Sequence, residues 1–186
     1  MADAIPRLDF DAVDAPLREL LKPTVDRLGY FGEFFQVAAH VPGAVPAFMQ
    51  YTAAVKAPLD NAQNEVLALT VCSMLEADYE RIQHERLAEK LGLSREWIAA
   101  AESRPGSHLS TLKPDERALQ ALAQAMVTRN GLRCGDEVSA VTSTLGPAKT
   151  VAALLQISRF TAIALLCNSL DLSLPVPSIF EETGRG

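Results

Sequence analysis

Two side chains near the middle of the sequence, Glu65 and His84, could together transfer protons. Histidine titrates close to neutral pH. A carboxylate beside it completes an acid–base pair, and general acid–base catalysis typically contributes about 10²–10⁴-fold to a rate. Tyr79 and Glu80 lie just before His84 and could line the same pocket, as a hydrogen-bond donor and a second carboxylate. Glu65 and His84 are therefore the candidate catalytic pair, and Tyr79 and Glu80 are candidate pocket residues.

The elements that must position this pair are two helices and the break between them. Asp60 can cap a helix over 61–75, and the apolar positions of that segment cover most of the helix circumference, so it should be buried. On one unbroken helix, Glu65 and His84 would lie roughly 28 Å apart, too far to act on one substrate. Asp78 can cap a second helix over 79–91, and a break at Ala77 and Asp78 would let the two groups approach; the family resemblance given below implies this break. No Gly or Pro at this point requires the break.

Each of these side chains also has a purely structural interpretation. Glu65 could be a partly exposed first-turn residue that the helix dipole favours, and His84 could be solvated on a helix surface. Tyr79 could be a packing residue with a satisfied hydroxyl, and Glu80 could be a dipole partner at the start of its own helix. These alternatives stay open at the level of sequence.

The rest of the sequence predicts helices and no strand. Apolar residues recur at three- and four-residue spacing, and Gly or Pro residues separate the segments. One long loop is expected over 103–114, and an irregular tail over 173–186. Together these features predict a single all-α domain over 1–186 with about eight or nine helices. The further helices are expected over 14–28, 34–40, 44–55, 94–101, 115–128, 135–145 and 147–170.

The composition narrows the possible functions. Hydrophobic residues make up 48% of the 186 residues, enough to sustain a core without disulfides or metal. The net charge of −6 and the lack of any run of Lys or Arg argue against nucleic acid or a membrane surface as a partner. Polar residues interrupt the most apolar stretch, 151–172, so we expect a core helix rather than a membrane span. The first ten residues do not resemble a signal peptide, and we expect a cytoplasmic protein.

No cofactor and no metal site is expected. The three cysteines are widely spaced and form no CxxC motif, which indicates a reducing compartment. Cys72 and Cys167 should be buried, and Cys134 should lie at the surface near a helix start. No glycine-rich phosphate loop occurs, and the histidines lack metal-ligand spacing. The histidines are His40, His84 and His108.

One cation could complete the pocket. Arg159 is the only charged residue over 151–170, the apolar part of the helix predicted over 147–170. It is the best candidate to hold a substrate carboxylate, although a buried ion pair would explain its position equally well. We include Arg159 with Tyr79 and Glu80 among the pocket residues.

The stretch from Glu65 to His84 resembles the core of the carboxymuconolactone decarboxylase / alkylhydroperoxidase-D (AhpD-like) family. In that family a helix opens with Glu, and a CxxC motif follows, with a His four residues after its second cysteine. Glu65 and His84 match the glutamate and the histidine at the family spacing, whereas Ala77 and Glu80 occupy the cysteine positions. The run from Tyr79 to His84 is similar to the Tyr-Glu-x-x-x-His form of the cysteine-free branch. The resemblance covers about residues 6–172, with a core over about 40–130, and departs at residue 64, where Asn replaces the usual Arg.

The resemblance implies an AhpD-like helical bundle that forms homo-oligomers, often trimers or hexamers, with its pocket near a subunit interface. It implies an enzyme, a lyase of the decarboxylase type, in which His84 transfers the proton and Glu65 orients it or acts as base. The substrate would be a small carboxylated or lactone-like metabolite. The alternatives are a thiol peroxidase of the alkylhydroperoxidase kind and a non-catalytic oligomer that binds a small molecule. Ala77 and Glu80 disfavour the peroxidase because they remove the peroxidatic thiolate and its resolving partner.

Overall fold

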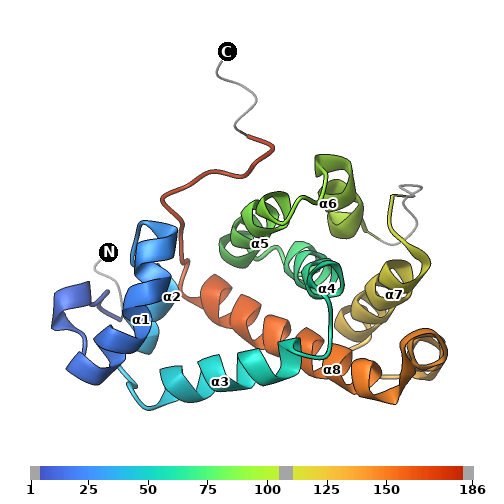
Figure 1. Ribbon diagram of the computed structural model, residues 1–186, viewed down its shortest axis with the longest axis horizontal. Helices are drawn as coiled ribbons and strands as arrows, with labels where there is room; N and C mark the ends of the chain where they lie inside the picture. The colour runs from blue at the N-terminus through green and yellow to red at the C-terminus, as the bar shows by residue number, and fades with distance from the viewer. Residues whose placement is uncertain (1–4, 105–110, 182–186) are drawn as a thin grey trace.

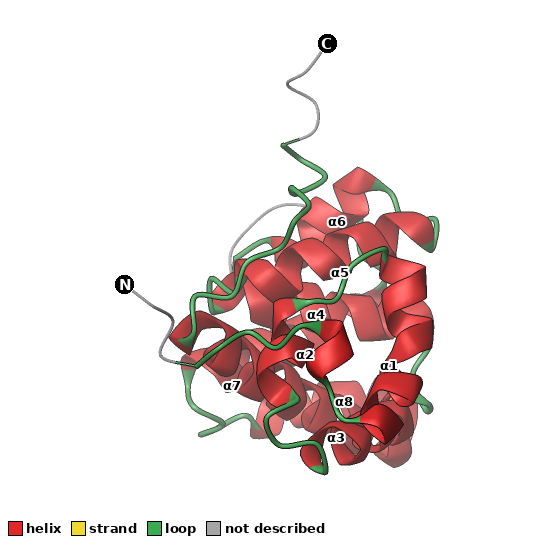
Figure 2. Ribbon diagram, turned by 90° about the vertical axis from the view of Figure 1, so that its left-hand side faces the viewer, coloured by secondary structure: helices red, strands yellow, loops and turns green. Residues whose placement is uncertain are grey.

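The computed structural model describes residues 5–104 and 111–181, and within these ranges it contains helices and loops but no strand (Figure 2). This confirms the prediction of an all-α fold with about eight or nine helices. A short 3-10 helix, Phe10–Ala12, precedes the first α-helix. The α-helices are α1 (Ala15–Leu28), α2 (Glu33–Ala38), α3 (Ala44–Lys56), α4 (Asn61–Met74), α5 (Asp78–Lys90), α6 (Arg95–Glu102), α7 (Pro114–Thr128) and α8 (Gly135–Ser169).

Helix α4 starts at the predicted cap and is the central element of the bundle. The Asp60 side chain accepts a hydrogen bond from the Gln63 backbone, and the Gln63 side chain accepts one from the Asp60 backbone, which completes a capping box. Figure 1 views α4 almost along its axis, with α5, α6, α7 and α8 around it. Its residues Val66, Leu67 and Leu69 are fully buried in the main hydrophobic cluster. The prediction of a buried helix here is confirmed.

The chain reverses direction between α4 and α5, as the candidate site requires. The Ala77 amide donates to the Cys72 carbonyl at 2.9 Å, and the Glu76 amide donates to the Ser73 carbonyl at 3.3 Å, the two bonds of a Schellman motif. Glu76 adopts a left-handed conformation with φ of 53°, a position at which Gly is more usual. The break therefore needs neither Gly nor Pro. The predicted cap was wrong by one residue, since Ala77 is the N-cap and Asp78 is the first helical residue.

Helices α1, α2 and α3 lie together on one side of this bundle, with α3 running along α8 (Figure 1). They bury two smaller clusters of their own. One is centred on Leu17 and Leu21 of α1, and the other brings Phe34 and Val37 of α2 against Tyr79 of α5. These three helices form one wall of the cavity described below.

Helix α8 consists of two helical segments that meet at a kink at Gly146, which confirms the predicted boundary there. Gly146 has a φ of 79° inside an otherwise helical run, and Pro147 follows it. By length and composition alone α8 could cross a membrane, but half of its most apolar 18-residue window is buried in the bundle. It packs against α3, α4, α5 and α7.

The chain after α8 runs along the bundle without forming a helix (Figure 1). The Arg86 side chain donates to the Pro177 carbonyl at 2.9 and 3.0 Å, and the Glu85 carboxylate accepts from the Ser178 hydroxyl at 2.5 Å. Ile179 is fully buried in the main cluster. We call residues 172–181 the C-terminal segment.

Candidate active site

The fold brings Glu65 and His84 into direct contact. Nδ1 of His84 lies 2.7 Å from Oε2 of Glu65, a hydrogen-bond distance between α4 and α5. Glu65 is 1% exposed, and the His84 side chain is 17% exposed. The interpretations of Glu65 as a partly exposed first-turn residue and of His84 as a solvated surface residue are therefore wrong. The predicted break places the two groups together within one chain.

The environment of His84 favours its protonated form. Burial acts to lower the pKa of His84, but the charge of Glu65 and the hydrogen bond to it act to raise the pKa and prevail. The more distant charge of Glu80 acts in the same direction, and that of Arg159 opposes it. The net result is a pKa above the ordinary histidine value, so His84 carries a proton more often near neutral pH than a free histidine does.

Glu80 completes a row of three titratable groups. Its Oε2 lies 3.9 Å from Nε2 of His84, on the side of the ring opposite Glu65. Glu80 belongs to the first turn of α5, as its interpretation as a helix-dipole partner requires. It also lines a cavity that His84 does not reach. From the cavity inward, the order is Glu80, His84 and Glu65.

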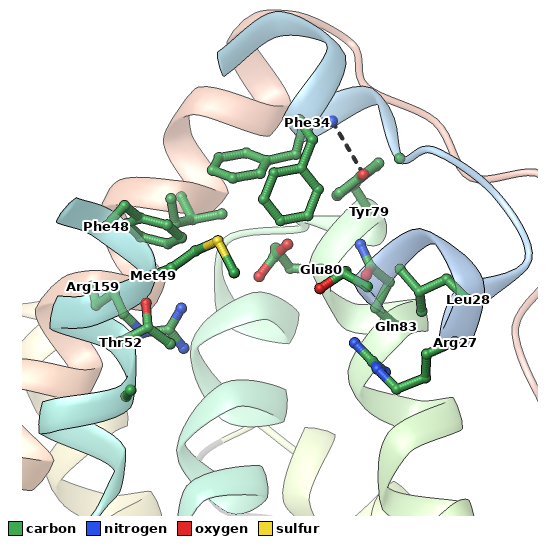
Figure 3. A pocket seen from close by; sticks show the side chains of 15 residues that line it. Arg27, Leu28, Phe34, Phe48, Met49, Thr52, Tyr79, Glu80, Gln83 and Arg159 are labelled. Carbon is green, nitrogen blue, oxygen red and sulfur yellow. Dashed lines mark hydrogen bonds between the residues drawn. The ribbon is translucent and has the colours of Figure 1, made fainter. Parts of the chain in front are cut away.

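The cavity has a volume of about 320 Å³ and lies between α1, α2 and α3 on one side and α5 and α8 on the other. Figure 3 shows Glu80 near its middle, with Arg159 and Arg27 at opposite ends of the view. The apolar part of its wall comes largely from α2, α3 and α8. These side chains include Phe34, Phe35, Phe48, Met49 and Ile163.

Tyr79 combines both of the roles considered for it. Its hydroxyl accepts a hydrogen bond from the Phe34 backbone amide at 3.1 Å, drawn dashed in Figure 3, and the residue is 4% exposed. Burial raises the pKa of Tyr79 strongly, so it stays a neutral phenol. A Cβ atom at Gly32 would lie 2.6 Å from this hydroxyl, so the contact depends on glycine there. Tyr79 is a satisfied packing residue that also lines the cavity.

Arg159 projects from α8 to the cavity and is not part of a buried ion pair. Its Nε donates to Gln156 Oε1 at 2.8 Å, and its guanidinium carbon lies 3.8 Å from the centre of the Phe160 ring. Among the described residues, no carboxylate forms an ion pair with it. Burial lowers the pKa of Arg159, and the nearby charge of Glu80 acts against that effect. The prediction that Arg159 lines the pocket agrees with this placement.

A second hollow, of about 350 Å³, approaches His84 from the other side. It is lined by His84, Tyr30, Val176 of the C-terminal segment and others. Arg27 and Gln83 line both hollows, so they form part of the wall between them. The His84 ring is thus reached from one hollow, and the Glu80 carboxylate from the other.

The cysteines do not contribute to the cavity wall. Cys72, Cys134 and Cys167 are free and buried, so the prediction of a surface position for Cys134 is wrong. Burial raises the pKa of Cys72 and of Cys167 well above the ordinary thiol value. Both thiols are therefore poor sources of the thiolate that peroxide chemistry needs.

No group of three or more His, Cys, Asp or Glu side chains in the described ranges is placed to hold a metal ion. His40 Nε2 lies 2.8 Å from the Pro6 carbonyl oxygen, far along the chain from the candidate site. His108 lies outside the described residues.

The sequence did not identify the cavity wall contributed by α2 and α3. Phe34, Phe48 and Met49 are apolar residues in amphipathic helices, and such residues are usually core. Gln83 and Arg27 resemble ordinary surface residues of their helices. No local pattern distinguishes these five side chains, because the cavity forms only when α1–α3 pack against α5 and α8.

Comparison with solved structures identifies the architecture. No family model and no curated protein matches the sequence. The debrominase Bmp8, solved with 2,3,4-tribromopyrrole, superposes with a TM-score of 0.78 at 16% identity, over 95% of this chain and 94% of that one. An uncharacterized peroxidase-related protein with an alkylhydroperoxidase AhpD core, from Ralstonia eutropha JMP134, superposes with a TM-score of 0.74 at 16% identity, over 90% of each chain. The chain has the AhpD-like fold.

A further AhpD-like neighbour is an uncharacterized peroxidase-related protein from Silicibacter sp. TM1040. It superposes with a TM-score of 0.78 at 11% identity, over 93% of this chain and 92% of that one. At these identities the likeness establishes the AhpD-like fold. Assignment to the cysteine-free branch remains a prediction.

Proposed function

We propose that the protein is an acid–base enzyme that acts on a small carboxylate or lactone-type metabolite in the cavity at Glu80. The observation that carries this proposal is the row Glu80–His84–Glu65, in which a buried carboxylate and an imidazole stand behind a carboxylate at the cavity wall. Pairing a titratable group with a buried partner is how proteins place acid–base chemistry near neutral pH. In this assignment Glu80 exchanges the proton with the substrate. His84 and Glu65 restore it.

For a decarboxylase of the carboxymuconolactone type, the proton balance is simple. The bond from the substrate carbon to its carboxylate breaks and releases carbon dioxide. The electron pair passes into the unsaturated lactone carbonyl, and the carbon then takes a proton that His84 supplies by way of the Glu80 carboxylate. His84 recovers its own proton from solvent through the second hollow, while Glu65 stabilises the imidazolium.

Thiol peroxidase activity is less well supported than acid–base activity. Ala77 and Glu80 stand at the positions where the family carries its cysteines, and Ala77 is fully buried. The remaining thiols are buried, and the pKa values of Cys72 and Cys167 are raised. The peroxidase-related description of two neighbours therefore fits the fold better than the chemistry available here.

The test measures carbon dioxide release from lactones that carry one carboxylate, with deuterium incorporation into the product in deuterated water. Turnover should fall by about 10²–10⁴-fold in Glu80→Gln and in His84→Gln. The matched control is Glu89→Gln, on the same helix but paired with Arg95 away from the cavity, and it should keep full activity.

The alternatives give different results in the same assay. Equal activity in the wild type and both site variants would reject the acid–base assignment. Binding of these lactones without any turnover would favour the non-catalytic oligomer. A variant with all three cysteines replaced should keep full activity, and peroxide consumption that disappears in that variant would establish the peroxidase instead.

Self-assembly and location are part of the same proposal. A homo-oligomer, either a trimer or a hexamer, in the cytoplasm and formed by one domain per chain fits the resemblance. Apolar side chains on the outer side of α8 are exposed and available for such an interface, namely Val151, Leu155, Leu165 and Leu166. Analytical ultracentrifugation of the full chain distinguishes these assemblies from a monomer.

A further inference from the structure

We propose that the cavity binds a small monocarboxylate, with the carboxylate on Arg159 and a ring-sized apolar body against the aromatic wall of α2 and α3. This inference rests on the proposed function, since it names the class of substrate that the same cavity would take. It goes further in assigning each end of the molecule to a part of the wall.

The guanidinium of Arg159 is a partly buried cation that forms no ion pair with a carboxylate in the described part of the chain. Its Nε is already used by Gln156, at 2.8 Å, and one face lies over the Phe160 ring. The two terminal nitrogens have no hydrogen-bond partner among the described residues. They lie on the edge of the group that can hold both oxygens of a carboxylate at once.

A chain of buried amides fixes the direction of this guanidinium. Gln156, which accepts from Arg159, donates to Asn64 Oδ1 at 2.6 Å. Asn64 in turn donates to the backbone carbonyls of Lys56, Leu59 and Asp60, at 2.9 to 3.3 Å. Asn64 and Gln156 are 2% and 1% exposed. A donor held in place before binding loses less conformational entropy when a ligand arrives, which strengthens binding.

The charges around the cavity favour a single negative charge. Its wall carries two arginines, Arg27 and Arg159, and one carboxylate, Glu80, in a protein whose net charge is −6. One anion brings the net charge of this wall close to zero. A phosphate dianion would meet Glu80 with only two cations to offset it, and no glycine-rich loop is available to bind it.

The size and lining of the cavity define the rest of the ligand. About 320 Å³ is at the lower end of the range for small-molecule sites. Phe34 and Phe48 offer an apolar surface on the side away from Arg27 (Figure 3), and Ile163 adds to the apolar lining. One aromatic ring or a short alkyl chain fills such a space and gains from leaving water.

The test is a binding measurement that needs no turnover. Phenylacetate and phenylacetamide have nearly the same shape and differ in charge, while acetate lacks the ring. Isothermal titration of the full chain should show phenylacetate binding about 10- to 100-fold more tightly than phenylacetamide. Acetate should bind at least about tenfold more weakly than phenylacetate.

Variants assign the preference to one arginine. Arg159→Gln should bring the acid and the amide to within about twofold of each other. Arg129→Gln, a surface arginine paired with Glu137, should leave the preference unchanged. Arg159→Lys keeps the charge but not the fork, so it should retain less than a third of the preference. If Arg159→Gln does not fold, Arg159→Lys serves as the test variant in its place.

Two results would overturn the inference: equal binding of phenylacetate and phenylacetamide by the wild type, or loss of the preference in Arg27→Gln but not in the Arg159 variants. The outcome is independent of catalysis, because His84→Gln should keep the full preference. A cavity that prefers phenylacetate, with no lactone turned over, would retain the anion site and reject the proposed enzyme. Turnover of a lactone without a preference for phenylacetate over phenylacetamide would retain the proposed enzyme and reject the anion site.

Discussion

Two neighbouring faces of helix α5 each carry a carboxylate and a basic group, but the surroundings of the two pairs differ. Glu80 and His84 lie four residues apart on one face, and Arg81 and Glu85 lie four residues apart on the next, turned by about 100°. The first face meets Glu65 and opens on a cavity. The second is closed by the C-terminal segment.

The closed face satisfies its carboxylate completely. Glu85 is fully buried, is paired with Arg81, and accepts from the Ser178 hydroxyl at 2.5 Å and the Ile179 amide at 3.1 Å. Glu80 makes no hydrogen bond to any described residue. Glu85, a buried carboxylate bound by arginine and backbone, therefore has a structural role. Glu80, a carboxylate beside an imidazole at a cavity, is free to exchange a proton with a ligand.

The largest expected effect is on activity at the open face. Glu80→Gln should reduce turnover by about 10²–10⁴-fold, equivalent to about 2.7–5.5 kcal/mol in the barrier. Its free energy of unfolding should change by less than about 1 kcal/mol, because no hydrogen bond within the protein is lost. Urea denaturation beside the lactone assay measures both quantities. A variant that lost activity only through unfolding would remove the contrast between the faces.

The closed face should show the opposite behaviour. Arg81→Met leaves the Glu85 carboxylate buried without its cation and should cost about 3 kcal/mol of stability. Asp78→Asn removes the exposed partner of the same arginine and should change stability by less than about 0.5 kcal/mol. Urea midpoints of the two variants test this. Equal losses would show that Arg81 does not stabilise the face through Glu85.

The contact that supports the cavity wall can be broken from the side of α2. Gly32→Ala places a Cβ about 2.6 Å from the Tyr79 hydroxyl and should destabilise the protein by roughly 1–3 kcal/mol. Tyr79→Phe removes that oxygen, so the double variant should be more stable than Gly32→Ala alone. Thermal unfolding of the four proteins in the cycle gives the coupling. Additive losses would mean that the clash is relieved elsewhere.

The smallest effect concerns Glu102, which lies beside Arg81 on the closed face. Burial, together with the charge of Glu85, raises the pKa of Glu102 from 4.5 to about 8. Between these values the folded protein binds the proton that the unfolded chain has released, so stability falls as pH rises from about 5 to 8 and then levels off. We expect a contribution of roughly 2 kcal/mol after allowing for partial exposure.

The comparison of Glu102→Gln with the wild type checks this sign. The variant should gain on the wild type as the pH rises, and should be the more stable protein at pH 9. His84, whose pKa is also raised, loses its own contribution as pH rises, but it does so equally in both proteins. Parallel pH profiles would show that Glu102 is not protonated in the folded state.

The sequence predicted those elements whose cause is local. The capping residues Asp60 and Ser94 lie directly before helices α4 and α6, because a cap acts within three residues of itself. The boundary at Gly146 likewise follows from one residue type. Arg159 was recognisable as a pocket residue because a lone charge in an apolar helix needs a specific environment.

Features that depend on contacts between residues far apart in the sequence could not be predicted from the sequence. The reversal after Leu75 uses Glu76 in a left-handed conformation, which residue type does not favour. Whether Glu80 or His84 faces the cavity depends on where α1–α3 pack. Glu85 looks like an ordinary surface charge in sequence, and its hydrogen bonds to residues 178–179, more than 90 positions further along the chain, form only in the folded protein.

That last contact bears on how the protein matures during synthesis. The Glu85 carboxylate on α5 accepts hydrogen bonds from Ser178 and Ile179, which lie 93 and 94 positions further along the chain. These donors are absent until both residues have emerged from the ribosome. Until then the Glu85 carboxylate lacks both of these donors, and Ile179 is missing from the core. The hydrogen bonds of Glu85 on α5 are therefore completed among the last events of folding. Truncated chains that end before position 178 should be recognised by cellular quality control as incompletely folded.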